Sequence, residues 1–164
     1  MSALDPLVLK SELDDNLAVL QGIYTFFIKA LEEDVPKLGR NQSSALIIAG
    51  IAENYYTCLE TGFFRVSQFF ENNLSKEHWH SDLLHKMSIA IDTVRIAVLS
   101  PQTASIMDEL LRFRHFKRYY YRLEFDWDRI DFLVVKLRQV HPMILEDLKR
   151  FTGFLAEISA GQDT

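Results

Sequence analysis

The sequence has little of what several classes of protein require. Its single cysteine, Cys58, excludes an internal disulfide and every metal or redox motif built on a Cys-x-x-Cys pair. Six glycines and four prolines among 164 residues provide too few turns for a fold of many strands. No apolar run approaches the roughly 18 to 20 residues that span a bilayer. The first residues also lack the basic and apolar regions of a secretory signal, so we expect a cytoplasmic protein without membrane contact.

Apolar residues recur at steps of three and four along most of the chain, which is the pattern of helices that bury one face. The spacing predicts helices over residues 13–38, 45–69, 79–99 (in one or two pieces), 101–121 and 127–159. Short connections between them favour an all-α, up-and-down four-helix bundle with a possible extra short helix. We expect residues 1–164 to form one such domain. Four aromatic residues stand off the main stripes and could either widen the core or cover a partner: Phe26, Phe64, Phe70 and Phe132.

Motifs for metal, nucleotide or acyl chemistry are lacking. Helical bundles that bind two metal ions repeat a Glu-x-x-His pair, and only Glu77 with His80 fits that spacing, without a second copy. At a predicted loop-to-helix boundary, a solvated or capping role is the expectation for His78 and His80. His141 falls on the buried stripe of the last predicted helix, where a hydrogen-bonded core histidine is expected. The sequence therefore predicts no metal site and no cofactor.

One segment, residues 112–122, differs from the rest of this acidic chain. It contains five of the eighteen lysines and arginines, three tyrosines and no acidic residue, although the net charge of the whole chain is −5. Basic side chains attract phosphates, and aromatic rings offer stacking faces to unpaired bases. The alternative is a solvated basic face whose arginines pair with acidic residues of other helices. The basic candidates for phosphate binding are Arg112, Arg114, Lys117, Arg118 and Arg122.

The segment resembles the signature of HepT-like toxins, which belong to the HEPN superfamily of helical RNA-cleaving domains. Their pattern is Arg, four residues, His, one residue, Tyr, and the same frame here runs from Phe113 to Tyr121, followed by Asp126-Trp127. Two upstream stretches are similar to the same branch: Glu53-Asn54-Tyr55-Tyr56-x-x-x-Glu60 and Trp79-His80-x-x-Leu83-Leu84-x-x-Met87. The resemblance covers roughly residues 45–150.

Carried over position by position, Arg114 matches the motif arginine and Tyr121 the motif tyrosine, whereas the motif histidine falls on Tyr119. Metal-independent RNA cleavage needs a group that takes the 2′-hydroxyl proton near neutral pH, and tyrosine is a poor base there. Two interpretations remain open. His115 could supply the imidazole in a cleft shared with a second subunit, or Tyr119 only positions RNA and cleavage is weak or absent. The predicted catalytic group is therefore Arg114, His115 and Tyr119.

The resemblance also implies partners. Its members are homodimers whose active cleft lies at the subunit interface, and they are paired with a minimal nucleotidyltransferase antitoxin that can transfer AMP to the motif tyrosine. Tyr121 is the matching acceptor, and a negatively charged adduct there would occupy the phosphate site beside Arg114 and Arg118. The resemblance thus implies a toxin-type, RNA-binding protein and possible ribonuclease. The alternative is a catalytically silent interaction or substrate-binding subunit for a minimal nucleotidyltransferase.

Overall fold

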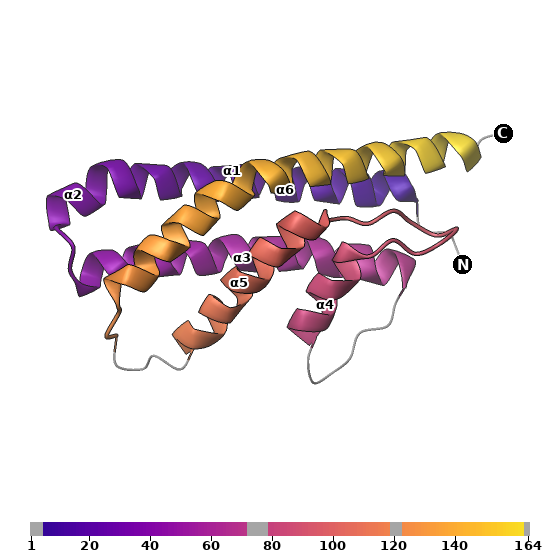
Figure 1. Cartoon of the computed structure of the whole chain (residues 1–164). Helices are drawn as coiled ribbons and strands as arrows, with labels where there is room; N and C mark the ends of the chain where they lie inside the picture. The colour runs from indigo at the N-terminus through magenta and orange to yellow at the C-terminus, as the bar shows by residue number, and fades with distance from the viewer. Residues whose placement is uncertain (1–4, 72–78, 119–122, 163–164) are drawn as a thin grey trace.

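The computed structural model describes residues 5–71, 79–118 and 123–162, with the backbone alone for Trp79, residues 114–118 and Gln162. Within these ranges the chain forms five packed helices and no strand, which confirms the all-α prediction (Figure 1). The short extra helix is α4. The first of the five helices is continuous through α1 (Pro6–Lys29), η1 (Ala30–Asp34) and α2 (Val35–Leu38). The other four are α3 (Gln42–Phe70), α4 (Trp79–Ser88), α5 (Pro101–Arg118) and α6 (Trp127–Gln162).

The first helical rod consists of α1, the π-helical turn η1 and α2. It begins at Asp5, whose carboxylate accepts a hydrogen bond from the Leu7 amide at 2.8 Å, with Pro6 in the first helical position. The π-helical turn precedes Pro36, which has no amide hydrogen to donate to the preceding turn. The rod ends at Gly39, whose positive φ of 78° suits a residue without a side chain. Its end at Leu38 agrees with the helix predicted over residues 13–38.

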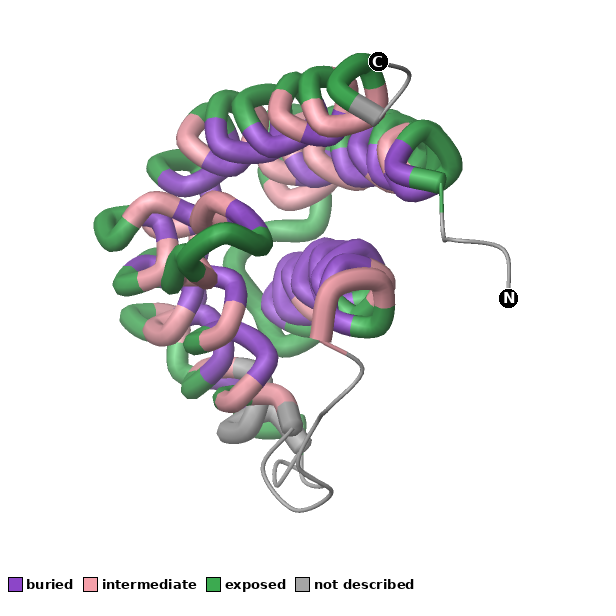
Figure 2. Tube along the Cα trace, turned by 90° about the vertical axis from the view of Figure 1, so that its right-hand side faces the viewer, coloured by how far each residue is buried: buried purple, intermediate pink, exposed green. Residues whose placement is uncertain are grey.

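Helix α3 is the most enclosed element and packs against α1, α4, α5 and α6 (Figure 2). Its start is a reciprocal cap, in which Asn41 Oδ1 accepts from the Ser44 amide and Ser44 Oγ accepts from the Asn41 amide, both at 3.0 Å. Fully buried residues follow along its length: Ala45, Ile48, Tyr55, Leu59 and Val66. The hydrophobic cluster built around them includes buried residues of α1, α4, α5 and α6.

The prediction of helix over residues 79–99 is wrong beyond Ser88. Residues 89–99 form a link that returns to the end of α4, where the amides of Val98 and Leu99 bond to the Met87 carbonyl at 2.9 and 3.0 Å. The cause is Arg95, whose fully buried guanidinium bonds to the carbonyls of Lys86 and Ile89 and to the Glu71 carboxylate. These bonds join the link to the last turn of α4 and to Glu71, and they hold residues 89–99 in place of another helical turn.

Helix α6 runs past Pro142 and buries His141, as predicted. The Tyr55 hydroxyl lies 2.8 Å from His141 Nδ1, and the imidazole stacks on Tyr24 with ring centres 3.7 Å apart. Burial lowers the pKa of His141 and raises that of Tyr55, because both charged forms lose hydration. This group of three side chains belongs to the core between α1, α3 and α6.

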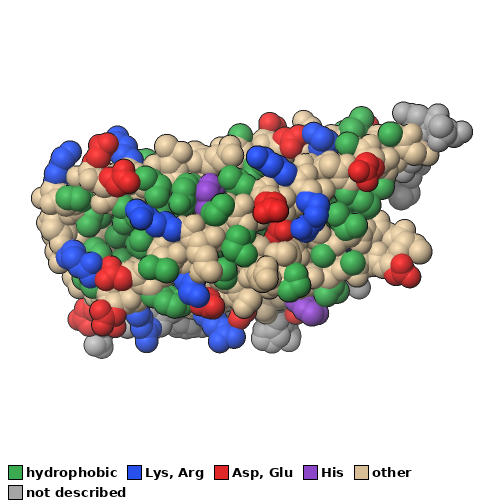
Figure 3. Space-filling model, turned by 45° about the horizontal axis from the view of Figure 1, so that its top comes forward, with side chains coloured by type: hydrophobic (Ala, Val, Ile, Leu, Met, Phe, Trp, Pro, Cys, Tyr) green, Lys and Arg blue, Asp and Glu red, His purple; other side chains and the backbone are tan. Residues whose placement is uncertain are grey.

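The off-stripe aromatic residues divide into two kinds. Phe70 packs against the core, whereas Phe26, Phe64 and Phe132 are exposed. Over the face formed by α1 and α6, acidic and basic side chains are interspersed among apolar patches (Figure 3). None of the helices in the described ranges is both long and apolar enough to cross a membrane. That residues 1–164 form one domain stays a prediction.

Candidate nucleic-acid interface

Helix α5 carries residues 112–118 of the basic segment, and its start is fixed to α6. Ser100 Oγ accepts a hydrogen bond from the Thr103 amide at 3.3 Å, so Ser100 is the N-cap of the helix, whose start at Pro101 agrees with the prediction. The Ser100 amide in turn donates to the Asp147 carboxylate of α6 at 2.8 Å. Arg150 bonds to the other oxygen of Asp147 and reaches the carbonyls of Ala97 and Val98. The beginning of α5 is therefore held by a network of paired polar groups.

The backbone of α5 is helical as far as Arg118. Five predicted site residues stand on it: Arg112, Arg114, His115, Lys117 and Arg118. The side chains of the last four, and residues 119–122 altogether, lie outside what the structure describes. The roles predicted for them, and for Tyr119, Tyr121 and Arg122, stay predictions.

Two of the basic residues, Arg114 and Arg118, fall at helix positions that continue the buried stripe of α5. On a helix of about 100° per residue, Met107, Leu111, Arg114 and Arg118 fall within an arc of about 60°. Met107 and Leu111 are buried against the rest of the bundle. Arg112 lies off this stripe and its side chain is 80% exposed, where it pairs with Asp108 at 2.8 Å. The last two turns of α5 thus place cationic residues at positions that the preceding turns use for the core.

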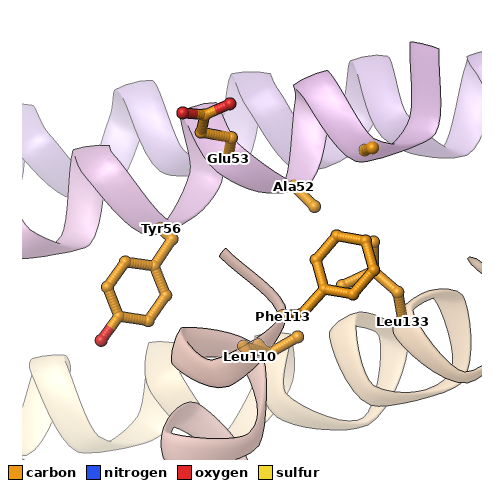
Figure 4. A pocket seen from close by; sticks show the side chains of 7 residues that line it. Ala52, Glu53, Tyr56, Leu110, Phe113 and Leu133 are labelled. Atoms are coloured by element: carbon orange, nitrogen blue, oxygen red, sulfur yellow. The ribbon is translucent and has the colours of Figure 1, made fainter. Parts of the chain in front are cut away.

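Apolar side chains fill the space between α3, α5 and α6 next to these turns (Figure 4). Ala52, Leu110, Phe113 and Leu133 converge there and leave a gap of about 10 Å³. This volume holds about one water molecule and no larger ligand. This contact fixes the position of the last turns of α5 relative to α3.

A larger groove lies between α5 and α6. Glu109, Arg112 and Phe113 of α5 and Arg129 and Phe132 of α6 line a volume of about 320 Å³. Glu109 is paired with Lys136, whose amine lies 3.0 Å from the carboxylate and 5.2 Å from the centre of the Phe132 ring.

The groove thus combines two arginines and two phenylalanine rings with the Glu109 carboxylate, whose charge is paired with Lys136. Arginines beside aromatic rings suit a phosphate-bearing, partly apolar ligand. Sequence reasoning identified Arg112 but not Arg129, because Arg129 lies seventeen residues away on a helix with an ordinary charge pattern.

A second polar pair joins α3 to α4. His80 Nδ1 lies 2.5 Å from Glu60 Oε1, and the two side chains are 15% and 6% exposed. The expectation of a solvated or capping role for His80 is therefore wrong, because the first turn of α4 carries it into contact with a buried carboxylate. No group of three or more His, Cys, Asp or Glu side chains in the described ranges is arranged to hold a metal ion.

A match to a protein-family model identifies the family of this chain. The sequence model of a family described as HepT-like protein matches residues 47–155, which run from the first turns of α3 almost to the end of α6. The chain belongs to the HepT-like protein family. The match agrees with the resemblance over residues 45–150 and leaves α1 outside it. Comparisons with curated proteins and with solved structures found no match.

Proposed function

We propose that this HepT-like protein is the toxin-type member of a toxin–antitoxin pair, and that it binds RNA and cleaves it without a metal ion. One observation carries the proposal beyond family membership: Arg114 and Arg118 stand on the same stripe of α5 as buried Met107 and Leu111. A cation near apolar surface is costly unless an opposite charge compensates it. The phosphates of an RNA strand would supply that charge.

We assign a role in RNA binding or cleavage to each residue of the predicted site. Arg114 and Arg118 hold the phosphate at the reacting centre, and Arg112, Lys117 and Arg122 neutralise its neighbours. Tyr119 and Tyr121 contact the bases or sugars. His115, one turn before Tyr119, is the proton acceptor that the sequence motif offers.

We further propose a homodimer that closes over the groove. Phe132 and Val135 lie one turn apart on α6, with 48% and 60% of their surface exposed, and Phe132 lines the groove itself. Contiguous exposed apolar residues beside a polar site are typical of subunit contacts. A second subunit placed there would turn the open groove into a shared cleft.

The paired antitoxin would be a minimal nucleotidyltransferase. In the step that we propose, the Tyr121 phenol oxygen attacks the α-phosphorus of ATP, loses its proton to solvent and releases pyrophosphate. The AMP adduct would place a negative charge beside Arg114 and Arg118 and so displace RNA. Mass spectrometry of protein co-expressed with its partner should show this addition on Tyr121, and an unmodified spectrum would contradict the step.

The function itself is tested by RNA cleavage with a chelator present. We expect the purified protein to cleave single-stranded RNA, and the Arg114→Ala variant to lose the activity. The matched control is Lys149→Ala, which removes an exposed cation of α6 that has no assigned role in RNA binding. Equal loss in both variants would reduce the effect to total charge and contradict the assignment to Arg114.

The alternative function is a catalytically silent interaction or substrate-binding subunit for the nucleotidyltransferase. Tyr119 in place of the motif histidine favours it. In that case no RNA is cleaved by the parent protein, and Tyr119→His either gains activity, which indicates a decayed site, or does not, which indicates an interaction module.

A further inference from the structure

We propose that the groove between α5 and α6 is a subsite for one nucleotide of the bound RNA, whose base stacks on Phe132 while Arg112 holds its phosphate. The inference rests on the proposed RNA-binding function and adds the place where an unpaired base is held. Both residues lie outside the signature frame of residues 113–121, and both side chains are described by the structure.

Phe132 offers an aromatic face to this groove. It lines the groove, and 48% of its surface is exposed. The Lys136 amine lies 5.2 Å from the centre of the ring and is paired with Glu109, so an ion pair that joins α5 to α6 stands against the ring. Exposed apolar surface is unfavourable in water, and the flat face of a base covers a phenyl ring without needing a hydrogen bond. Stacking is therefore the contact that Phe132 supplies to a ligand.

Phe113 forms the inner wall of the groove and is held from behind. Its side chain packs with Ala52, Leu110 and Leu133 between α3, α5 and α6, and it also lines the groove (Figure 4). That packing leaves a gap of only about 10 Å³, which is room for about one water molecule. The groove thus has a fixed aromatic wall on α5 and an exposed aromatic ring on α6.

The charges around the groove favour a phosphate beside the base. Arg112 and Arg129 provide a cation from each helix, and the carboxylate of Glu109 is compensated by Lys136 at 3.0 Å. Arg112 pairs with Asp108, but a guanidinium has five N–H donors, so this pair leaves donors for a phosphate oxygen. The volume of about 320 Å³ is at the lower end of ligand sites in proteins, which suits a single nucleotide unit.

The position of the groove favours a nucleotide that belongs to a strand. Arg112 is both a wall of the groove and the first residue of the basic segment, residues 112–122. A strand whose phosphates bind that segment therefore begins or ends its contact at the groove. A free mononucleotide has the same base and phosphate, so the experiment must distinguish the two.

The test uses two oligonucleotides of equal length that lack the attacking hydroxyl: a 2′-O-methyl RNA, and an abasic chain with the same sugars and phosphates. Their affinities are measured by fluorescence anisotropy for the parent and for Phe132→Leu, which keeps an apolar side chain but removes the aromatic face. We expect the preference for the base-bearing strand to fall about 5- to 150-fold, the contribution of one stacked base. Phe132→Tyr should keep the preference.

Three further variants separate stacking from other roles. Phe26→Leu is the matched control, because Phe26 is 56% exposed on α1, and it should keep the parent's preference. Arg112→Gln should weaken both oligonucleotides alike and lower the salt dependence by about one phosphate contact. Val135→Asp disturbs the proposed dimer contact outside the groove and should leave the preference for bases unchanged.

Several results would overturn the inference while leaving RNA binding intact. These are an unchanged preference in Phe132→Leu, an equal loss in Phe26→Leu or Val135→Asp, and a parent that binds the abasic chain as tightly as the base-bearing strand. Displacement of the strand by free AMP at the affinity of the strand itself would assign the groove to a mononucleotide and also overturn it. Failure of the parent to bind either oligonucleotide would overturn the proposed function itself.

Discussion

The two ends of helix α5 use charge in opposite ways. At its start, the Asp147 carboxylate accepts hydrogen bonds from the Ser100 amide and from Arg150. Arg95 bonds to backbone carbonyls and to Glu71, so each of these charges has a partner within the chain. At its other end, residues 112–118 contain four cations and no acid, and Arg112 pairs with Asp108 of the preceding turn. The first arrangement fixes the fold, whereas in the function that we propose the second binds the phosphates of RNA. On that proposal, the groups that pair with the charges distinguish a structural end from a binding end more than the number of charges does.

The sharpest way to break this comparison is to remove the structural arginine. Arg95→Met would leave three backbone carbonyls and one oxygen of the half-buried Glu71 without the arginine donor, and we expect a loss of about 3–5 kcal/mol in the free energy of unfolding. Urea unfolding measures it. Arg112→Met, which removes an 80% exposed arginine, should change the free energy of unfolding by at most about 0.5 kcal/mol. Similar losses in the two variants would mean that the ends of α5 do not differ as described.

The proposed dimer contact beside the groove between α5 and α6 is tested next. The double variant Phe132→Asp, Val135→Asp places two charges on the exposed surface beside the groove, and we expect the molar mass measured by light scattering to fall from dimer to monomer. The free energy of unfolding per chain should fall only by the amount that the lost dimer contact contributed, because the substituted residues are exposed in the single chain. Val19→Asp on α1, a substitution at an equally exposed position, is the control. A dimer that survives the double variant would place the contact elsewhere.

A smaller effect is expected at the cap of α5. Ser100→Ala removes the oxygen that accepts from the Thr103 amide, and such caps contribute about 1 kcal/mol. Urea unfolding should show this loss with RNA cleavage unchanged, because the other end of the helix is not altered. Lost cleavage at unchanged stability would contradict the separation of the two ends.

The pH dependence of stability tests the burial of His141 in the core. Burial lowers the pKa of His141 in the folded state, so the unfolded chain binds more protons below its ordinary value of about 6.5. Stability conferred by neutral His141 is therefore complete above pH 6.5 and decreases as the pH falls below it. His141→Gln should show a weaker fall in the urea midpoint between pH 7.5 and 5.5 than the parent. Parallel curves would assign the pH dependence to other groups.

Sequence periodicity predicted the long helices because their buried stripes are local patterns. It failed over residues 89–99, where Arg95 bonds to groups from Glu71 to Ile96 that no local pattern brings together. It also missed the contact of His80 with Glu60, because twenty residues and a helix boundary separate them. The basic segment was visible as composition. Its alignment with Met107 and Leu111 became evident only once those residues proved to be buried.

The proposed division of α5 into a structural end and an RNA-binding end is tested most directly by the affinity for a fluorescent single-stranded RNA, measured by anisotropy over a range of salt concentrations. The variant Arg114→Ala, Arg118→Ala should bind far more weakly, with a salt dependence reduced by about two phosphate contacts. The variant Lys10→Ala, Lys149→Ala removes the same charge from helices α1 and α6 and should bind like the parent. Equal affinities for the two double variants would contradict an RNA site at the end of α5.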